Sequence, residues 1–320
     1  MLPDAAPVAT LAILNYNGRA LLERMLPTVF AQTARDFTVA VLDDGSTDDS
    51  LEYLAERWPD VEVLPAERNA GITASMARAV ASARTPYVAL LNNDLELDAR
   101  WLEEMLAAAA RHPDAAAFDG KMLQSRRRTH LDGAGDWMEP AGYPRRRGEG
   151  EPDRGQYDRE EEVFAATGGA ALYRRDAFDV VGPFDVDFYA YYEDVDWGFR
   201  ARLHGLATWY VPTAVSYHLG SATTSQTAGR FASLVIRNQV TMTVKDFPPG
   251  LLWRRLLRIL FFQAKWLAFD VVHRRGRAHV RGLAQALRAL PATLRKRRAV
   301  QRARTAGARA IAAAMGCRRR

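Results

Sequence analysis

An alternation of strand-like and helix-like segments over the first 120 residues constrains the fold of this chain more than any other feature. Short apolar runs at residues 8–14, 38–42, 61–64 and 87–91 are each followed by a segment with apolar residues at helical spacing. This order predicts a parallel sheet covered by helices on both faces, because parallel neighbours need a crossover connection. Residues 125–162 show little periodicity and are expected to form a long surface loop.

Charge divides the chain near residue 250. Residues 1–250 carry 25 Lys and Arg against 37 Asp and Glu, whereas residues 251–320 carry 19 against a single acidic residue, Asp270. The basic part begins with large apolar and aromatic residues that alternate with Arg and Lys. This pattern predicts an amphipathic helix lying on anionic lipid.

Several classes of protein are disfavoured by what the sequence lacks. The single cysteine, Cys317, allows no intrachain disulfide and fits a reducing compartment. We expect neither a signal peptide nor a transmembrane helix, because the N-terminal apolar run is short and no apolar stretch of about 18 residues occurs. No glycine-rich phosphate loop is present. A nucleotide would therefore have to be held by carboxylates and a metal.

Polar residues gather where the predicted strands end, at the edge of the sheet where ligands bind. They are Asn15 and Asn17 after the first strand, Asp43 and Asp44 after the second, and Asn92, Asn93 and Asp94 after the fourth. Helix capping explains the acidic pair about as well as nucleotide binding does. Asp94 is well placed to hold a hard cation such as Mg²⁺ or Mn²⁺, with His218 as a possible softer ligand.

An acidic and aromatic segment, residues 188–197, supplies candidate catalytic groups. Glu193, Asp194 and Asp196 stand at the start of a predicted helix, where they would also favour the helix dipole. Neighbours such as Tyr192 and Trp197 indicate a partly desolvated cleft, in which the pKa of a carboxyl group rises and the group can act as a base. The same rings suit stacking on sugars, although core packing is the commoner use of aromatic residues.

Taken together, the motifs of residues 8–240 resemble the family 2 glycosyltransferases and, within them, the bacterial rhamnosyltransferase-like branch. The matching motifs are Asn15-Tyr16-Asn17-Gly18, Asp43-Asp44-Gly45-Ser46-Thr47-Asp48, Asn69-Ala70-Gly71, Leu91-Asn92-Asn93-Asp94, Thr167-Gly168-Gly169-Ala170, Gly182-Pro183-Phe184-Asp185, Glu193-Asp194-Val195-Asp196-Trp197, His218-Leu219-Gly220-Ser221 and Arg237-Asn238. The resemblance implies a GT-A fold, with a Rossmann-like, mostly parallel sheet flanked by helices. It also implies inverting transfer of a sugar from a nucleotide-diphosphate donor.

The same resemblance implies roles for single residues. Asp194, beside Glu193, would be the base that removes the proton of the acceptor hydroxyl. Asp94 would hold Mg²⁺ or Mn²⁺ with His218, because Asn92 replaces the first acidic residue of the family's metal motif. The donor-binding residues would be Asn15, Asn17, Asp43, Asp44, Asn69, Gly71, Asn92 and Asn93. The acceptor-binding residues would be Gly168, Gly169, Tyr192, Trp197 and Arg200.

The expected organisation follows from these assignments. It consists of a GT-A domain at residues 1–245, with a donor-binding half (1–120) and an acceptor-binding half (121–245), and a basic helical tail at residues 246–320. The absence of a Q-x-x-R-W motif indicates transfer of a single sugar rather than polymerisation. We expect a cytoplasmic protein, peripheral on the inner membrane face through residues 251–275, with a glycan or lipid-linked acceptor and, by resemblance, rhamnose as the sugar.

Two other classes of function stay open at this point. A nucleotidyltransferase also uses carboxylate-bound metal, but it would normally need more paired acidic residues and a basic phosphate cradle than residues 1–120 contain. A non-enzymatic protein could use the basic tail as a nucleic-acid-binding arm. The large apolar residues between the tail's basic residues favour lipid, so no nucleic acid is expected.

Overall fold

The computed structural model describes residues 6–220 and 228–316, so Ser221 and Cys317, named above, lie outside the described residues. The first part of the chain alternates between strands and helices, as its sequence pattern predicts. The elements are β1 (Ala9–Asn15), α1 (Arg19–Phe30), β2 (Phe37–Asp43), α2 (Ser50–Arg57), β3 (Glu62–Pro65), α3 (Ile72–Ser82), β4 (Tyr87–Asn92), β5 (Leu95–Leu97) and α4 (Trp101–Arg111).

One mixed sheet runs through the body of the molecule in the order β10-β12-β6-β11-β4-β1-β2-β3. Its remaining strands are β6 (Ala115–Gln124), β10 (Glu161–Val163), β11 (Ala170–Arg174) and β12 (Ala207–His218). The strands from β3 to β4 are parallel, whereas β11 is antiparallel to both of its neighbours. The carboxyl ends of β1, β2 and β4 therefore meet at one edge of the sheet, as expected.

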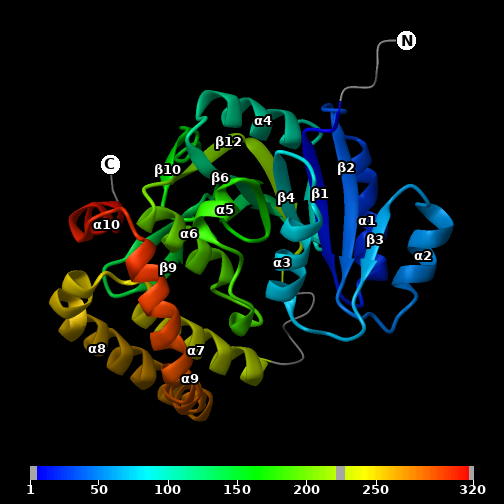
Figure 1. The fold of residues 1–320 in the computed structure, drawn as a ribbon. Helices are drawn as coiled ribbons and strands as arrows, with labels where there is room; N and C mark the ends of the chain where they lie inside the picture. Colours follow the sequence, from blue (N-terminus) through cyan, green and yellow to red (C-terminus); the bar gives the residue numbers. More distant parts are fainter. Residues whose placement is uncertain (1–5, 221–227, 317–320) are drawn as a thin grey trace.

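Helices cover both faces of this sheet (Figure 1). Apolar residues of α1, α2 and α4 pack on one face. The other face is covered by α3, α5 (Ala177–Val181) and α6 (Glu193–Leu203). Because both faces are covered, β1 is buried along its whole length. Its sequence is accordingly almost continuously apolar.

The expectation of a surface loop at residues 125–162 is wrong. This segment contains β7 (Arg127–Gly133), which pairs with β6, and a hairpin of β8 (Asp136–Glu139) and β9 (Tyr143–Arg146). The strands are short, and the buried face of the hairpin includes a carboxylate, Asp136, which is 7% exposed. Hydrophobic periodicity therefore does not reveal them.

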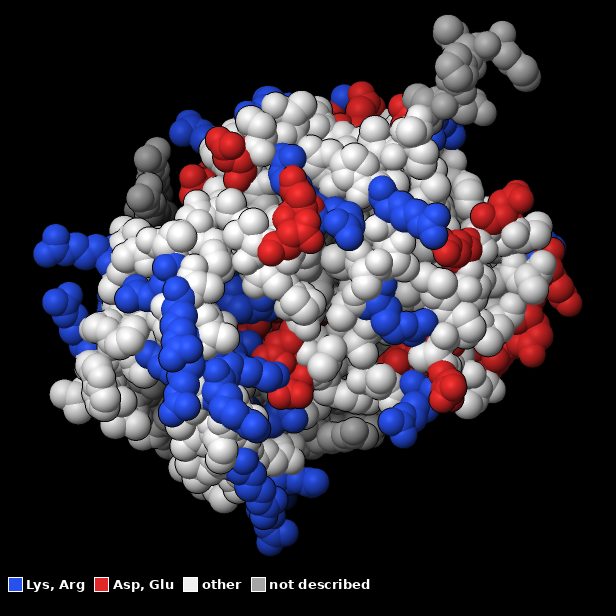
Figure 2. Space-filling model, viewed as in Figure 1, with Lys and Arg blue, Asp and Glu red and all other residues white. Residues whose placement is uncertain are grey.

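The basic part of the chain is helical and lies beside β9 and α6, on the side of the molecule away from β3 (Figure 1). It follows α7 (Ala228–Asp246) and consists of α8 (Pro249–Val272), α9 (Gly276–Ala303) and α10 (Ala308–Ala314). Residues of α6, α7, α8 and α10 share one apolar core, which includes Phe199, Met242, Leu251, Ile259 and Ile311. Lys and Arg side chains gather over α8 and α9 in Figure 2. Within the described residues, none of the helices is both long and apolar enough to span a bilayer.

Candidate active site

The loops after β1 and β2 are joined by a network of side-chain hydrogen bonds. Asn15 Nδ2 donates to Asp43 Oδ2 at 2.8 Å, and Asn15 Oδ1 accepts from Asn93 Nδ2 at 2.8 Å. Asp43 also accepts from the backbone N–H and the hydroxyl of Ser46, at 2.8 and 2.6 Å. Asn17, at a positive φ of 47°, donates its backbone N–H to the same hydroxyl at 2.8 Å. These predicted donor-binding residues lie together, and they also fix the shape of the two loops.

Asp44 connects the end of β2 to the loop before α3. Its two carboxylate oxygens accept the backbone N–H groups of Ala70 and Gly71, both at 2.9 Å. Burial raises the pKa of Asp44. Gly71 has a φ of 92°, and a Cβ there would come within 2.4 Å of the carbonyl oxygen of Tyr189. Asn69 accepts a hydrogen bond from the hydroxyl of the same tyrosine at 2.7 Å. The predicted donor site therefore touches the loop that precedes α6.

The residues at the end of β4 are suited to hold a divalent cation. The Oδ1 atoms of Asn92 and Asp94 are buried and find no hydrogen-bond partner in the described part of the chain. Oxygen atoms of this kind are the ligands that Mg²⁺ and Mn²⁺ prefer. Among the described residues, no group of three or more His, Cys, Asp and Glu side chains is arranged so that it could hold a metal ion by itself. A cation held here would therefore take its remaining ligands from the donor or from water.

His218 lies against the proposed metal residue. Its Nε2 atom is 3.2 Å from Asp94 Oδ2, and its Nδ1 atom is 3.0 Å from Asp132 Oδ2. Burial lowers the pKa of His218, but the hydrogen bonds to the two carboxylates outweigh it and raise the pKa to about 9. The imidazole thus contacts Asp94 directly, and its role as a second metal ligand stays a prediction.

Asp194 stands at the start of α6 and faces the loop between β10 and β11. Its carboxylate accepts the backbone N–H of Gly168 and of Val195, both at 2.7 Å. A Cβ at Gly168 would come within 3.1 Å of the Asp194 side chain, so glycine allows the close approach. The next residue, Gly169, accepts the backbone N–H of Asn92 at 2.8 Å. The two glycines thus connect the end of β4, where the candidate metal residues Asn92 and Asp94 lie, to the predicted base.

Two of the three acidic residues of α6, Glu193 and Asp194, interact electrostatically. Burial raises the pKa of Asp194, while the backbone N–H groups of Gly168 and Val195 and the charge of Arg146 oppose the rise. Burial and the charge of Asp194 raise the pKa of Glu193. Because two neighbouring carboxylates repel each other, the pair takes up a proton more readily than isolated carboxyl groups do.

Three charged residues of this site were missed by sequence reasoning. Arg146 Nη1 lies 2.9 Å from Asp132 Oδ2, so that Asp94, His218, Asp132 and Arg146 form one chain of ionic contacts. Asp136, opposite Arg146 in the β8–β9 hairpin, has its pKa raised to about 7, mainly by burial. The only sequence signal was a pair of aspartates in a glycine-containing stretch, and that signal is weak.

The comparisons with known proteins identify the kind of enzyme. A family model described as "Glycosyl transferase family 2" matches residues 10–182, more than half of the chain. The chain belongs to this family. It is thus a glycosyltransferase that uses a nucleotide-sugar donor, as the sequence motifs indicate.

Curated and solved relatives support this assignment. N-acetylglucosaminyl-diphospho-decaprenol L-rhamnosyltransferase of Mycobacterium tuberculosis is 30% identical over 258 residues, which cover 72% of this chain and 81% of the relative. Among solved structures, GalNAc-T7 with UDP, GalNAc and Mn²⁺ aligns with a TM-score of 0.61 at 16% identity, over 77% of this chain and 49% of that one. The mannosyltransferase PcManGT from Pyrobaculum calidifontis, with GDP-Man and Mn²⁺, aligns with a TM-score of 0.54 at 18% identity, over 98% and 87% of the two chains. The prediction of a GT-A fold is confirmed.

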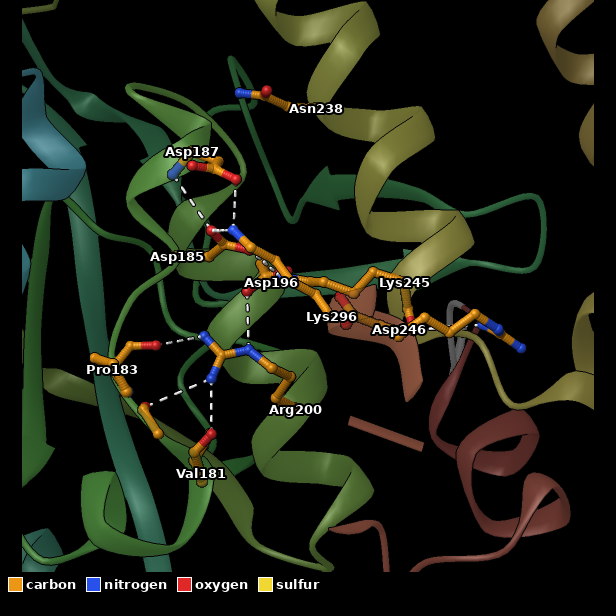
Figure 3. Close-up of polar contacts among 12 residues, drawn as sticks. Val181, Pro183, Asp185, Asp187, Asp196, Arg200, Asn238, Lys245, Asp246 and Lys296 are labelled. Carbon is orange, nitrogen blue, oxygen red and sulfur yellow. Dashed lines mark hydrogen bonds and ion pairs between the residues drawn. The ribbon is translucent and has the colours of Figure 1, made fainter. Parts of the chain in front are cut away.

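Two residues expected to bind the acceptor lie inside the glycosyltransferase instead. Trp197 is 1% exposed and packs on the ring of Tyr173, and its Nε1 donates to the carbonyl of Gly182. Arg200 donates to Asp196 at 2.9 Å and to the carbonyls of Val181 and Pro183 at 2.8 and 2.9 Å (Figure 3). Neither side chain reaches an acceptor, because the helix turns both toward the core.

The loop between η1 (Val186–Phe188) and α6 is held in an unusual conformation. Its residues at positive φ are Tyr189 (64°), Tyr191 (68°) and Tyr192 (74°). Non-glycine residues rarely adopt this region. Each such backbone conformation costs about 1–3 kcal/mol and persists only where the surrounding structure enforces it. Asn238, on α7 and 1% exposed, enforces it here. Its Nδ2 atom lies 3.1, 2.8 and 2.7 Å from the carbonyl oxygens of Phe188, Ala190 and Tyr191.

A buried ionic network ties the C-terminal helices to α6 (Figure 3). Lys245 Nζ, on α7, is 2.5 Å from Asp196 and 2.7 Å from Asp185. Lys296, on α9, contacts Asp185 and lies 2.6 Å from Asp187. Burial raises the pKa of Asp185, but the two lysines outweigh it and lower the pKa to about 2. Helix α9 is therefore anchored to the segment that leads into α6.

Proposed function

We propose that this glycosyltransferase moves a single sugar, with inversion at the anomeric carbon, to an acceptor hydroxyl that Asp194 deprotonates. The observation that carries the proposal is the position of Asp194. Its carboxylate is half-buried at a helix start and accepts the backbone N–H of Gly168, in the loop that contacts the end of β4. A carboxylate with a raised pKa is a competent base near neutral pH.

The reaction then follows from these groups. The acceptor oxygen attacks the anomeric carbon and its proton passes to Asp194, while the bond from that carbon to the diphosphate breaks. Burial raises the pKa of both carboxyl groups, and the positive charge of Arg146 favours the ionised form of Asp194 before the reaction. Gly168 fixes the orientation of the carboxylate through its N–H, so the base needs no rearrangement when the acceptor arrives.

A divalent cation, Mg²⁺ or Mn²⁺, is part of the proposal. Bound, it would offset the negative charge that develops on the leaving diphosphate. Asp94 and Asn92 would hold it through their unpartnered Oδ1 atoms. Support comes from the structures of GalNAc-T7 and PcManGT, which were both determined with Mn²⁺. His218 would act on Asp94 through its 3.2 Å contact.

The donor site is proposed at the ends of β1, β2 and β4. Asn15, Asn17, Asp43, Asp44, Asn69, Gly71, Asn92 and Asn93 line the joined loops or shape them. Gly168, Gly169 and Tyr192 remain the proposed acceptor-side residues. The division into residues 1–120 for the donor and 121–245 for the acceptor stays part of the proposal.

The proposed acceptor is lipid-linked, and the proposed sugar is rhamnose. Both rest on the similarity to the mycobacterial rhamnosyltransferase, whose name includes a diphospho-decaprenol acceptor. Helix α8 adds support, because Trp253, Leu257, Leu260 and Phe261 form an exposed apolar stripe at helical spacing, flanked by Arg and Lys. We propose that residues 251–275 hold the enzyme on an anionic membrane at its cytoplasmic face.

Calorimetric titration tests the donor site. Wild-type protein should bind one of dTDP, UDP and GDP more tightly when Mn²⁺ is present, and Asp94→Ala should lose the Mn²⁺ dependence. Asp194→Asn should keep nucleotide binding and lose transfer by a factor of about 10²–10⁴. Transfer at the wild-type rate by Asp194→Asn would refute the role of Asp194 as base.

A further inference from the structure

A groove of about 420 Å³ lies between the β8–β9 hairpin and helix α8. The hairpin contributes Tyr143 and Arg145, and α8 contributes Arg258, Phe262 and Lys265. None of these residues was assigned to the donor or acceptor sites above. The groove is thus a separate feature formed where the C-terminal helices meet the catalytic body.

The lining combines positive charge with apolar surface. Arg258 and Lys265 have no hydrogen bond or ion pair within the described residues. Arg145 faces only Glu139, with the nearest charged atoms 4.0 Å apart. A ligand suited to this lining carries two or more negative charges, because three cations face one carboxylate.

The apolar part of the groove continues into the membrane-facing side of α8. The ring of Phe262 packs 5.2 Å from that of Tyr143, and both line the groove. Phe261, beside them, is 71% exposed and belongs to the apolar stripe of α8. A hydrocarbon chain could therefore pass from the bilayer along Phe261 into the groove without crossing polar surface.

The hairpin also relates the groove to the catalytic base. In a paired hairpin, side chains of successive residues point to opposite faces. Glu139 and Tyr143 oppose each other on the groove face, whereas Asp136 and Arg146 oppose each other on the other face, where both interact electrostatically with Asp194. The groove and the base thus lie on the two faces of a single two-stranded layer.

Tyr192 lies between the hairpin and the base. It is 8% exposed, immediately precedes Glu193 and Asp194, and belongs to the apolar core that also includes Met138 of the hairpin and Ile259 of α8. A ligand whose charged group occupies the groove would have to extend past this side chain to reach the base.

We propose that this groove binds the diphosphate and the first prenyl units of a polyprenyl-linked acceptor, and so presents the acceptor sugar to Asp194. This inference rests on the proposed function, since it names the place where the lipid part of that acceptor is bound. Arg145, Arg258 and Lys265 hold the phosphate groups, and Tyr143, Phe261 and Phe262 contact the chain. An ordinary anionic phospholipid offers one charge and two stiffer anchoring chains, and it binds the exposed stripe rather than the groove.

Vesicle binding by the full-length protein tests this assignment. One set of phosphatidylcholine vesicles contains decaprenyl phosphate, and a second set contains phosphatidylglycerol at equal negative charge. The wild-type protein should bind the first set about tenfold more tightly, because charge-assisted contacts to phosphate in the groove add to the general attraction. Arg258→Ala/Lys265→Ala should bind both sets equally.

A matched control removes the same charge from the same helix. Arg254 and Arg255 lie on α8 outside the groove lining. Arg254→Ala/Arg255→Ala should weaken binding to both sets of vesicles and keep the preference for decaprenyl phosphate. The proposal is overturned if the wild-type protein shows no preference, or if the control variant loses the preference as completely as the groove variant does.

The assay needs no donor and no turnover, so it separates this inference from the proposed function. If the protein binds nucleotide but shows no lipid preference, only the groove assignment is refuted and the proposed donor site stands. A lipid preference that survives while no nucleotide binds supports the groove as a lipid site and refutes the proposed donor site.

Discussion

Replacing Asn238 by Asp tests how the catalytic helix is presented. The substitution keeps the size of the side chain and removes the NH₂ group that donates to the carbonyls of the loop before α6. That group has two hydrogens, so two of the three nearby carbonyls lose a donor in a buried environment. An unpaired buried polar group costs about 1–3 kcal/mol, so two of them give a total loss of about 2–6 kcal/mol.

The loss of stability should lower Tm, and the change in the loop should lower kcat. For a chain of 320 residues, an unfolding entropy of about 2.1 cal/mol/K per residue converts each kcal/mol into about 1.5 °C. We therefore expect Tm to fall by about 3–9 °C. Release of the three tyrosines from positive φ would also move Glu193 and Asp194, and kcat should fall by about tenfold or more. Because Tyr189 also contacts Asn69 and Gly71, the KM for the nucleotide sugar should rise as well.

Leu54→Ala is the matched control. Leu54 is fully buried on α2, on the opposite face of the sheet from α6, and its truncation should cost a similar 2–5 kcal/mol. Steady-state kinetics of both variants, measured well below their Tm, separate stability from positioning. A normal kcat in Asn238→Asp, or an equal loss of kcat in Leu54→Ala, would contradict the reasoning.

The remaining predictions concern ionisation and the membrane. Because the folded-state pKa of Asp185 is about 2, its ion pairs contribute about 2 kcal/mol above pH 3.8, which is lost as the pH falls toward 2. Lys296→Met should therefore destabilise the protein in urea at pH 6 and differ less from wild type at pH 2.5. Burial and Asp136 raise the pKa of Asp119 to about 8, so wild-type stability falls as the pH rises from 4 to 8. Asp119→Asn should raise Tm more at pH 8 than at pH 5, and an equal effect at both would count against a raised pKa. Trp253→Ser/Leu257→Ser should weaken binding to anionic vesicles. If the same variant also loses binding to random-sequence DNA to a similar extent, the tail would instead be a nucleic-acid-binding arm.

Much of this protein could be predicted from its sequence because local patterns record burial and chain direction. The apolar runs of β1, β2 and β4 predicted a sheet covered on both faces, and the polar residues after them mark the edge where Asn15, Asp43 and Asn93 meet. The apolar and basic residues of α8 likewise predicted a helix with an exposed apolar stripe.

Other features were decided only by the tertiary structure. His218 and Asp132 are 86 positions apart in the chain, and no local pattern predicts their contact. Arg146 reaches the site from a hairpin whose short strands include buried charges, so the hairpin itself escaped prediction. Trp197 shares its helix with Asp194 yet packs in the core: Asp194 lies in the first turn beside Gly168, whereas Trp197 lies one turn further along, against the sheet. Sequence periodicity reports which residues are buried along one element, whereas long-range packing decides which buried groups meet.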